Sequence, residues 1–275
     1  MQKSLPLMSN QEYDFVESEG RARHISFNKC PTCDARKEEI FPGVWEWPQN
    51  RTYKLFGETH PCNCAEQIEL LRHYILAGIP KDYWPLSDSA TDYWGDPKAL
   101  AAIKDYFEKW NEYKRFGIGL QIYSPQMGVG KTMLASLLAK WLIHEGERVL
   151  FISFREAVSL YHLADDKREA KTERLKNIPI LILDEVSSGF TEAQRNYLAL
   201  ELENLLRFRT SGNTVTIVTT NLTPDELEQE YARCFSLLSS KQIMINVNGS
   251  DVRKNGDKQL LDLELIANKE VRPII

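Results

Sequence analysis

The chain has 275 residues, of which 43% are apolar and 27% charged, and it carries a formal net charge of −5. These values are typical of a globular protein with one large domain or two smaller ones. They exclude a strongly basic nucleic-acid-binding chain, so any DNA contact would need a local patch or several subunits together. The sequence has neither an apolar run of about 18 residues nor a signal-peptide pattern, so we expect it to stay in the cytoplasm.

Near the N-terminus, cysteines occur in two close pairs. Four of the five cysteines are found there: Cys30, Cys33, Cys62 and Cys64. In a cytoplasmic protein such pairs are more typical of metal ligands than of disulfides, although they could also be plain reduced thiols. Two thiolate pairs supply the four corners of a tetrahedral zinc site, with His60 as an alternative to one thiolate. We predict a structural zinc ion here, and a buried, apolar role for the distant Cys234.

The residues around these cysteines predict a small domain. Short strands are expected on either side of Pro42-Gly43 and Pro48. After Cys64, apolar residues at helical spacing predict a helix that ends at Gly78. The polar, turn-rich stretch 87–97 indicates a boundary, so we predict a zinc-binding domain over residues 1–88 and a second domain over 89–275.

A glycine loop follows the first predicted strand of the second domain. A helix is expected from Pro97 to about Phe116, then a strand over 117–123, the loop SPQMGVGKT and a helix ending at Gly146. A phosphate-binding P-loop has this order of elements: a strand, a glycine loop, a Lys-Thr pair and a helix. Lys131 would neutralise the β- and γ-phosphates of ATP, and the Thr132 hydroxyl would bind Mg²⁺.

One position departs from the P-loop pattern. Pro125 stands where the first glycine is expected, and proline fixes φ and lacks an N–H donor. We expect an altered loop entrance or a reduced affinity for nucleotide. The predicted nucleotide-binding residues are Gly128, Val129, Gly130, Lys131, Thr132, Met133 and Asp184.

Two more apolar strands end in polar residues. The stretch 177–189 ends its apolar run at Asp184 and Glu185, which predicts a magnesium ligand and a base that orients and deprotonates water. The alternative is an acidic pair at a solvated edge. The stretch 213–222 ends at Asn221, which would lie beside Asp184 if the two strands are neighbours, at the sensor-1 position of AAA+ proteins. The alternative is a turn residue before the Thr223 helix cap.

The order of elements predicts the fold class. Further strands are expected over 148–154 and 241–253, so strands and helices alternate through the second domain. Alternation of this kind requires a parallel sheet with right-handed crossovers and helices on both faces. We therefore predict an α/β fold, an AAA+ P-loop ATPase with a parallel five-stranded sheet behind a small zinc-binding N-terminal domain.

Several segments together resemble the DnaC/DnaI-type loaders of replicative helicases, of the bacterial and phage sort. The resemblance runs from about Cys30 to Arg253. It covers the cysteine pairs and the segments AGIPKDYW, GLQIYSPQMGVGKT, LILDEV and LLRFRTSGNTVTIVTTNL. The last segment is more specific than the ATPase motifs alone.

The resemblance implies partners and further site residues. In that family the ATPase domains assemble side by side on single-stranded DNA, and the N-terminal module grips a hexameric helicase. Arg233 is similar to the arginine that reaches a neighbouring subunit's ATP, although Leu237 replaces the second arginine of that pattern. Arg253 resembles the sensor-2 arginine that meets the γ-phosphate, and the short helix expected after it matches the lidless loaders. The segment between the second and third strands corresponds to an inserted helix that tracks DNA.

Three functions remain open from the sequence. The first is a weak, switch-like ATPase that loads a replicative helicase. The second is a transposition helper of the IstB type, which shares the ATPase but binds duplex DNA. The third is an adaptor that binds nucleotide with little hydrolysis, which Pro125 and Leu237 favour.

Overall fold

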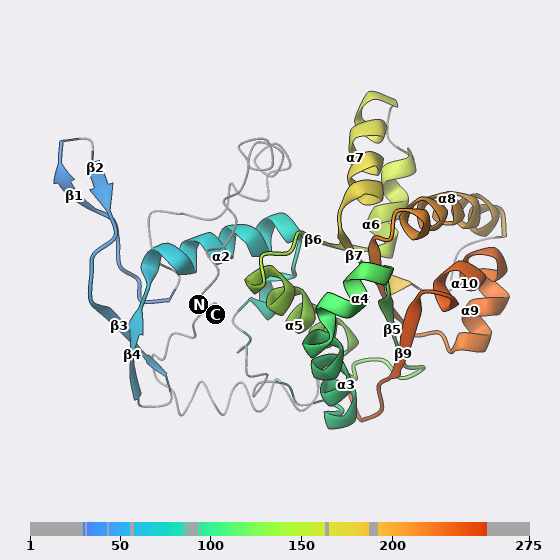
Figure 1. The fold of residues 1–275 in the computed structure, drawn as a ribbon, viewed down its shortest axis with the longest axis horizontal. Coiled ribbons are helices and arrows are strands. Elements are labelled where there is room, and N and C mark those ends of the chain that lie inside the picture. The colour runs from blue at the N-terminus through green and yellow to red at the C-terminus, as the bar shows by residue number, and fades with distance from the viewer. Residues whose placement is uncertain are drawn as a thin grey trace. The chain divides into compact units, whose positions relative to one another are not determined.

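The computed structural model describes residues 30–251 except 31, 43, 56–57, 85, 87–92, 94, 163–164 and 187–191. These residues form two compact units, one within residues 30–86 and one from Tyr93 to Asp251 (Figure 1). The predicted boundary between residues 88 and 89, Arg253 and the short helix expected after it lie outside the described residues. None of the helices described is long and apolar enough to span a membrane.

The N-terminal unit contains two small hairpins and a helix. Its elements are β1 (Glu38–Phe41), β2 (Val44–Glu46), β3 (Arg51–Leu55), β4 (Glu58–Cys62), α2 (Cys64–Ala77) and the 3₁₀ turn η1 (Lys81–Tyr83). Strands β1 and β2 pair antiparallel, as do β3 and β4. The Asn63 side chain accepts from the Glu66 N–H at the start of α2, and Gly78 ends the helix at φ 79°. The predicted short strands and helix are confirmed.

The second unit alternates strands and helices. Its elements are α3 (Pro97–Glu108), α4 (Trp110–Phe116), β5 (Gly119–Tyr123), α5 (Lys131–His144), β6 (Val149–Ser153), α6 (Phe154–Ser159), η2 (Leu160–His162), α7 (Asp165–Asn177), β7 (Ile180–Val186), α8 (Glu192–Ser211), β8 (Val215–Thr220), α9 (Pro224–Glu230), α10 (Ala232–Ser239) and β9 (Gln242–Asn246). The single helix expected over 97–116 is two helices, because the backbone of Lys109 leaves the helical region at ψ 11°.

Five parallel strands form the sheet of this unit. Their order is β6-β7-β8-β5-β9, and every neighbouring pair is parallel. Strand β8 therefore lies between β5, which precedes the glycine loop, and β7, which carries the acidic pair. Helices α5 and α8 both pack against β8. The predicted parallel five-stranded sheet is confirmed, with the additional strand between the two motifs.

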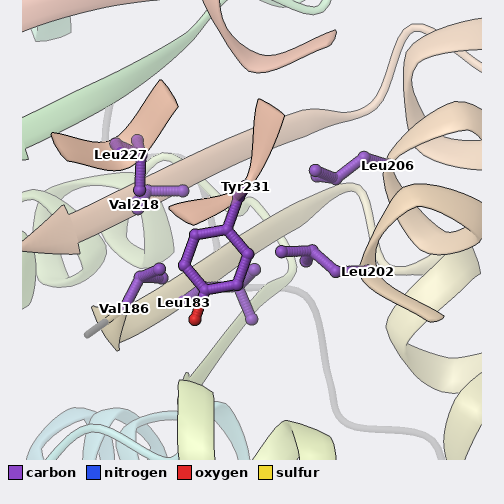
Figure 2. A pocket seen from close by; sticks show the side chains of 7 residues that line it. All are labelled: Leu183, Val186, Leu202, Leu206, Val218, Leu227 and Tyr231. Carbon is purple, nitrogen blue, oxygen red and sulfur yellow. The ribbon is translucent and has the colours of Figure 1, made fainter. Parts of the chain in front are cut away.

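Apolar side chains fill the space between the sheet and helices α8 to α10. This core contains a cavity of about 10 Å³. Figure 2 shows the side chains that line it: Leu183, Val186, Leu202, Leu206, Val218, Leu227 and Tyr231. A space of that size with an apolar lining offers a water molecule no hydrogen bond, so it is a packing defect rather than a ligand site. Cys234 is fully buried in the same cluster, as predicted, and Leu237 packs against it.

Candidate nucleotide site and cysteine cluster

The glycine loop connects β5 to α5 and depends on two left-handed glycines. Gly128 has φ 75° and Gly130 has φ 91°, a region that side chains with a Cβ rarely adopt. A Cβ on Gly130 would also lie 3.1 Å from the ring of Tyr93. Both glycines are therefore needed for the backbone to turn into the N-terminus of α5, where N–H groups can bind an anion.

Lys131 is held inside the loop. Its side chain is almost buried, and Nζ donates to the carbonyl oxygens of Gln126 at 2.9 Å and Ser124 at 3.3 Å. The Ser124 hydroxyl accepts from the Gln126 N–H at 3.2 Å, which closes a turn around the exposed Pro125. The loop thus forms with proline in place of the first glycine.

Asp184 lies at the centre of the site. The hydroxyl of Thr219 donates to Oδ1 at 2.5 Å, and the hydroxyl of Thr132 donates to Oδ1 and Oδ2 at 3.1 and 3.3 Å. Burial raises the pKa of Asp184, although the hydrogen bonds from Thr219 and Thr132 offset part of this effect. The fold therefore brings the P-loop threonine onto the acidic strand, as required if both residues serve one cation.

Glu185 adopts a strained backbone. Its φ is 59°, in the left-handed region, and the pairing of β7 with β8 shifts between Leu183 and Val186. The Glu185 N–H donates to the Thr219 hydroxyl at 2.9 Å, and its side chain is exposed. A non-glycine residue in this region costs about 1–2 kcal/mol, and such strain is often found at functional sites. The bulge turns the carboxylate out of the sheet at the end of β7.

Thr219 is a site residue that sequence reasoning missed. It joins the acidic pair, because its hydroxyl donates to Asp184 and accepts from the Glu185 N–H. Sequence reasoning selected Asn221 instead, which follows the last residue of β8 and is half-buried. The adjacency of β7 and β8 is confirmed, and a hydroxyl at the strand end before the asparagine was the available signal.

The side chains of the two predicted arginines lie outside the part of the chain that the structure describes. Arg233 belongs to α10, but its side chain lies outside the described residues, as does the whole of Arg253. At the position where a second arginine was expected, Leu237 packs on the core. An apolar contact explains the residue type at position 237, and the roles of Arg233 and Arg253 stay predictions.

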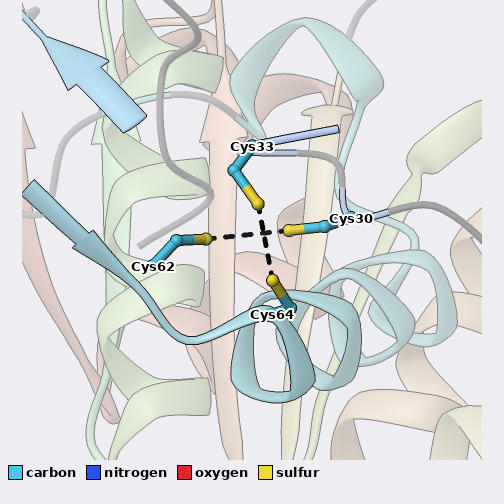
Figure 3. Close-up of side chains that lie close together, drawn as sticks. All are labelled: Cys30, Cys33, Cys62 and Cys64. Atoms are coloured by element: carbon cyan, nitrogen blue, oxygen red, sulfur yellow. Dashed lines mark hydrogen bonds between the residues drawn. The ribbon is translucent and has the colours of Figure 1, made fainter. Parts of the chain in front are cut away.

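The four paired cysteines meet in the N-terminal unit. Figure 3 shows their sulfurs converging from the loop before β1, the end of β4 and the start of α2. The Sγ atoms of Cys30 and Cys62 are 3.8 Å apart and those of Cys33 and Cys64 are 3.4 Å apart; all four lie within 4.8 Å of one another. Zinc–sulfur bonds of about 2.3 Å at tetrahedral angles place sulfurs about 3.8 Å apart, so the cluster could hold zinc.

Close packing of these thiols opposes the ionisation of Cys62 and Cys64. Burial and the charge of neighbouring thiols raise the pKa of Cys62, and burial with hydrogen bonds from Cys33 raises that of Cys64 to about 12. Ionised thiols this close repel one another unless a cation lies between them. His60 is outside the cluster: it stacks on Tyr53 and lies 3.8 Å from a Glu58 oxygen.

Fold and site together define the class of protein. A parallel five-stranded sheet with an additional strand, a P-loop and a Thr132–Asp184 pair form an ATP-binding domain of the AAA+ class. Residues 122–235 match the family described as IstB-like ATP binding protein.

A comparison with known proteins finds a similar sequence. The chain is 26% identical over 133 residues to the replicative helicase loader DnaC of Buchnera aphidicola subsp. Schizaphis graminum, covering 46% of this chain and 51% of the relative. It thus spans about half the length of that relative. It resembles the DnaC-type AAA+ loaders.

Solved structures share the fold. The DnaC helicase loader superposes with a TM-score of 0.52 at 23% identity, over 62% of this chain and 100% of that chain. The DnaI protein gives a TM-score of 0.52 at 20% identity, over 62% and 93%. The initiator DnaA bound to AMPPCP and single-stranded DNA gives 0.51 at 18% identity, over 71% and 63%. At these identities the likeness shows the fold alone.

Proposed function

We propose that this chain is an ATP-dependent loader that delivers a replicative DNA helicase onto single-stranded DNA. The observation that carries the proposal is the presence, in one chain similar to DnaC, of a P-loop paired with an acidic strand and a separate four-cysteine unit. The first supplies a nucleotide switch and the second a compact module for a protein partner.

Nucleotide binding would use the loop and the acidic strand. The backbone around Gly128, Val129, Gly130 and Met133 would surround the phosphates, because N–H groups at a helix start attract anions. Lys131 would exchange its bonds to loop carbonyls for bonds to the β- and γ-phosphates. Thr132 and Asp184, already in contact, would hold Mg²⁺ directly or through water.

Hydrolysis would be slow and would act as a switch. Glu185 would orient and deprotonate the attacking water, with Asn221 contacting the water or the γ-phosphate. Arg253 would contact the γ-phosphate of the ATP bound by its own subunit. Arg233 would reach the ATP bound by a neighbouring subunit. The apolar packing of Leu237 leaves that position unable to supply a second trans-acting cation. A site short of charge at the γ-phosphate favours binding over turnover.

The two units would contact different partners. We propose that the cysteine unit, stabilised by Zn²⁺, binds a hexameric replicative helicase. The ATPase units would assemble side by side with ATP along single-stranded DNA. A monomer of net charge −5 lacks a strong sequence-independent attraction to phosphates, whereas aligned subunits can combine small basic patches.

Two substitutions test the nucleotide roles. Lys131→Ala should remove most ATP affinity, since the phosphates lose their charged partner. Glu185→Gln should bind ATP as the native chain does but stop turnover in a single-turnover assay with single-stranded DNA and a candidate helicase. Hydrolysis by Glu185→Gln at the native rate would show that another group activates the water.

DNA binding separates the loader from the second candidate. The match of residues 122–235 to IstB-like proteins favours a transposition helper as the alternative. A loader should bind single strands cooperatively, only with ATP, and less tightly as salt rises, measured by fluorescence anisotropy with oligonucleotides of increasing length. Preference for duplex, or tight binding by the nucleotide-free monomer, would favour the transposition helper. ATP binding without turnover under any of these conditions would favour an adaptor.

A further inference from the structure

The end of the described ATPase unit returns to the glycine loop. After β9, the Val247 N–H donates to the Tyr123 carbonyl at 2.9 Å, and the Asn248 N–H donates to Asp96 Oδ2 at 2.9 Å. Gly249 then turns the chain at φ 147°, a conformation that favours glycine. The segment 247–251 is thereby fixed beside the loop that follows β5.

This segment places a carboxylate on the loop. A Cβ added to Gly128 would overlap the carboxylate of Asp251, with Oδ1 as the nearest atom, so the carboxylate packs directly against the Cα of Gly128. Asp251 is half-buried there. Glycine at position 128 is thus required twice, by its φ of 75° and by the contact with Asp251.

A carboxylate in this place opposes the loop's chemistry. The N–H groups at the start of α5 and the ammonium of Lys131 attract anions, and a phosphate bound there brings several negative charges. A fixed negative charge beside the same backbone repels a nucleotide, more strongly for a triphosphate than for a diphosphate. Asp184 and Glu185 lie at the end of β7 and are assigned to the cation and to water respectively, so neither explains a third carboxylate at Gly128.

We propose that Asp251 is an electrostatic gate that weakens ATP binding until the part of the segment 247–251 beyond Gly249 moves away from Gly128. This inference rests on the proposed nucleotide function of the loop. It makes nucleotide affinity depend on where the chain after β9 is held, so a partner that draws this segment away would tighten ATP binding without touching the loop itself.

The test compares Asp251→Asn with the native full-length chain by calorimetric titration of Mg-ATP and Mg-ADP. Glu145→Gln is the matched control, because it removes one charge at the far end of α5, about 20 Å away at a rise of 1.5 Å per residue. Asp251→Asn should bind ATP on the order of tenfold more tightly at low salt, with a smaller gain for ADP and a smaller gain at high salt. Glu145→Gln should change neither affinity.

The outcomes are distinguishable. If the native chain binds ATP and Asp251→Asn binds it equally or more weakly, the gate is wrong; weaker binding would make Asp251 an acceptor for a nucleotide hydroxyl or amino group instead. If neither binds ATP and Lys131→Ala is indistinguishable from both, the proposed nucleotide function fails together with the gate. If Asp251→Asn binds ATP and the native chain does not, the result would support a gate that blocks ATP binding completely.

Discussion

Arg209 offers the sharpest test of how the ATPase unit is held together. Its side chain is fully buried, and its guanidinium donates to the carbonyls of Leu175 at 2.7 Å, Ile178 at 2.8 Å and Val215 at 2.6 Å. Nε donates to the Thr216 hydroxyl at 2.9 Å. One side chain of α8 thus fastens the end of α7, the entry to β7 and the start of β8. Burial lowers the pKa of Arg209 to about 9.

The cost of removing it follows from these contacts. Arg209→Leu leaves three carbonyls in the interior without this donor, and each unsatisfied group costs about 1–3 kcal/mol. Part of the loss is offset, because the variant no longer buries a charge. We expect a net loss of about 3–5 kcal/mol, a large share of the roughly 5–15 kcal/mol of a typical domain. Arg209→Lys should also lower the free energy of unfolding, since an ammonium has three donors and lacks the planar, five-donor geometry of a guanidinium.

Urea denaturation followed by far-ultraviolet circular dichroism measures the loss. Arg207→Lys is the matched control on the same helix: the Arg207 side chain is 62% exposed and pairs with Glu203 at 2.7 Å, so an exposed exchange of one cation for another should cost about 0–1 kcal/mol. If Arg209→Leu and Arg207→Lys lower the free energy of unfolding equally, by under 1 kcal/mol, the carbonyls find other donors and our reasoning fails.

Three further predictions concern the two sites. The native chain purified without chelator should contain about one zinc ion, and Cys33→Ser should lose it and unfold the N-terminal unit while ATP binding remains; metal analysis that finds no zinc in the native chain would exclude the site. Asp184→Asn should be more stable than the native chain at pH 7, because the raised pKa of Asp184 means that its ionised carboxylate destabilises the fold. The gain in stability, measured by thermal denaturation, should disappear as pH falls to 3.8. A gain that persists at that pH would mean that packing, not charge, causes it. Glu185→Gly should raise the free energy of unfolding by about 1 kcal/mol, since glycine tolerates φ 59°, and should abolish hydrolysis, since the carboxylate is lost. A lower free energy of unfolding in urea would show that the backbone of Glu185 is not strained.

Local patterns predicted the elements of this protein well. The glycine loop, the strand before it and the helix after it are encoded by neighbouring residues, so Gly130 and Lys131 could be assigned without long-range information. The same holds for the cysteine pairs, because short spacing limits the geometry of each pair. The sheet order needed the structure, although alternation of strands and helices restricted it to parallel arrangements.

Long-range contacts explain what the sequence did not reveal. Thr219 contacts Asp184 across 35 positions, and a threonine near a strand end is unremarkable until the neighbouring strand is known. Arg209 lies within the segment LLRFRTSGNTVTIVTTNL, yet charge alone predicts an exposed side chain, and only the surrounding carbonyls show why it is inside. Residue propensities could not predict the left-handed backbone of Glu185, because glutamate rarely adopts that conformation.

The hydrogen bond between Asp96 and Asn248 has a consequence for how such chains are assembled. It joins the beginning of the ATPase unit, where Asp96 caps α3, to the segment that follows its last strand. Entry and exit of the ATPase unit therefore lie side by side, at Asp96 and Asn248. A unit with this arrangement can be exchanged between chains as a cassette, since the modules attached to either end need no rerouting.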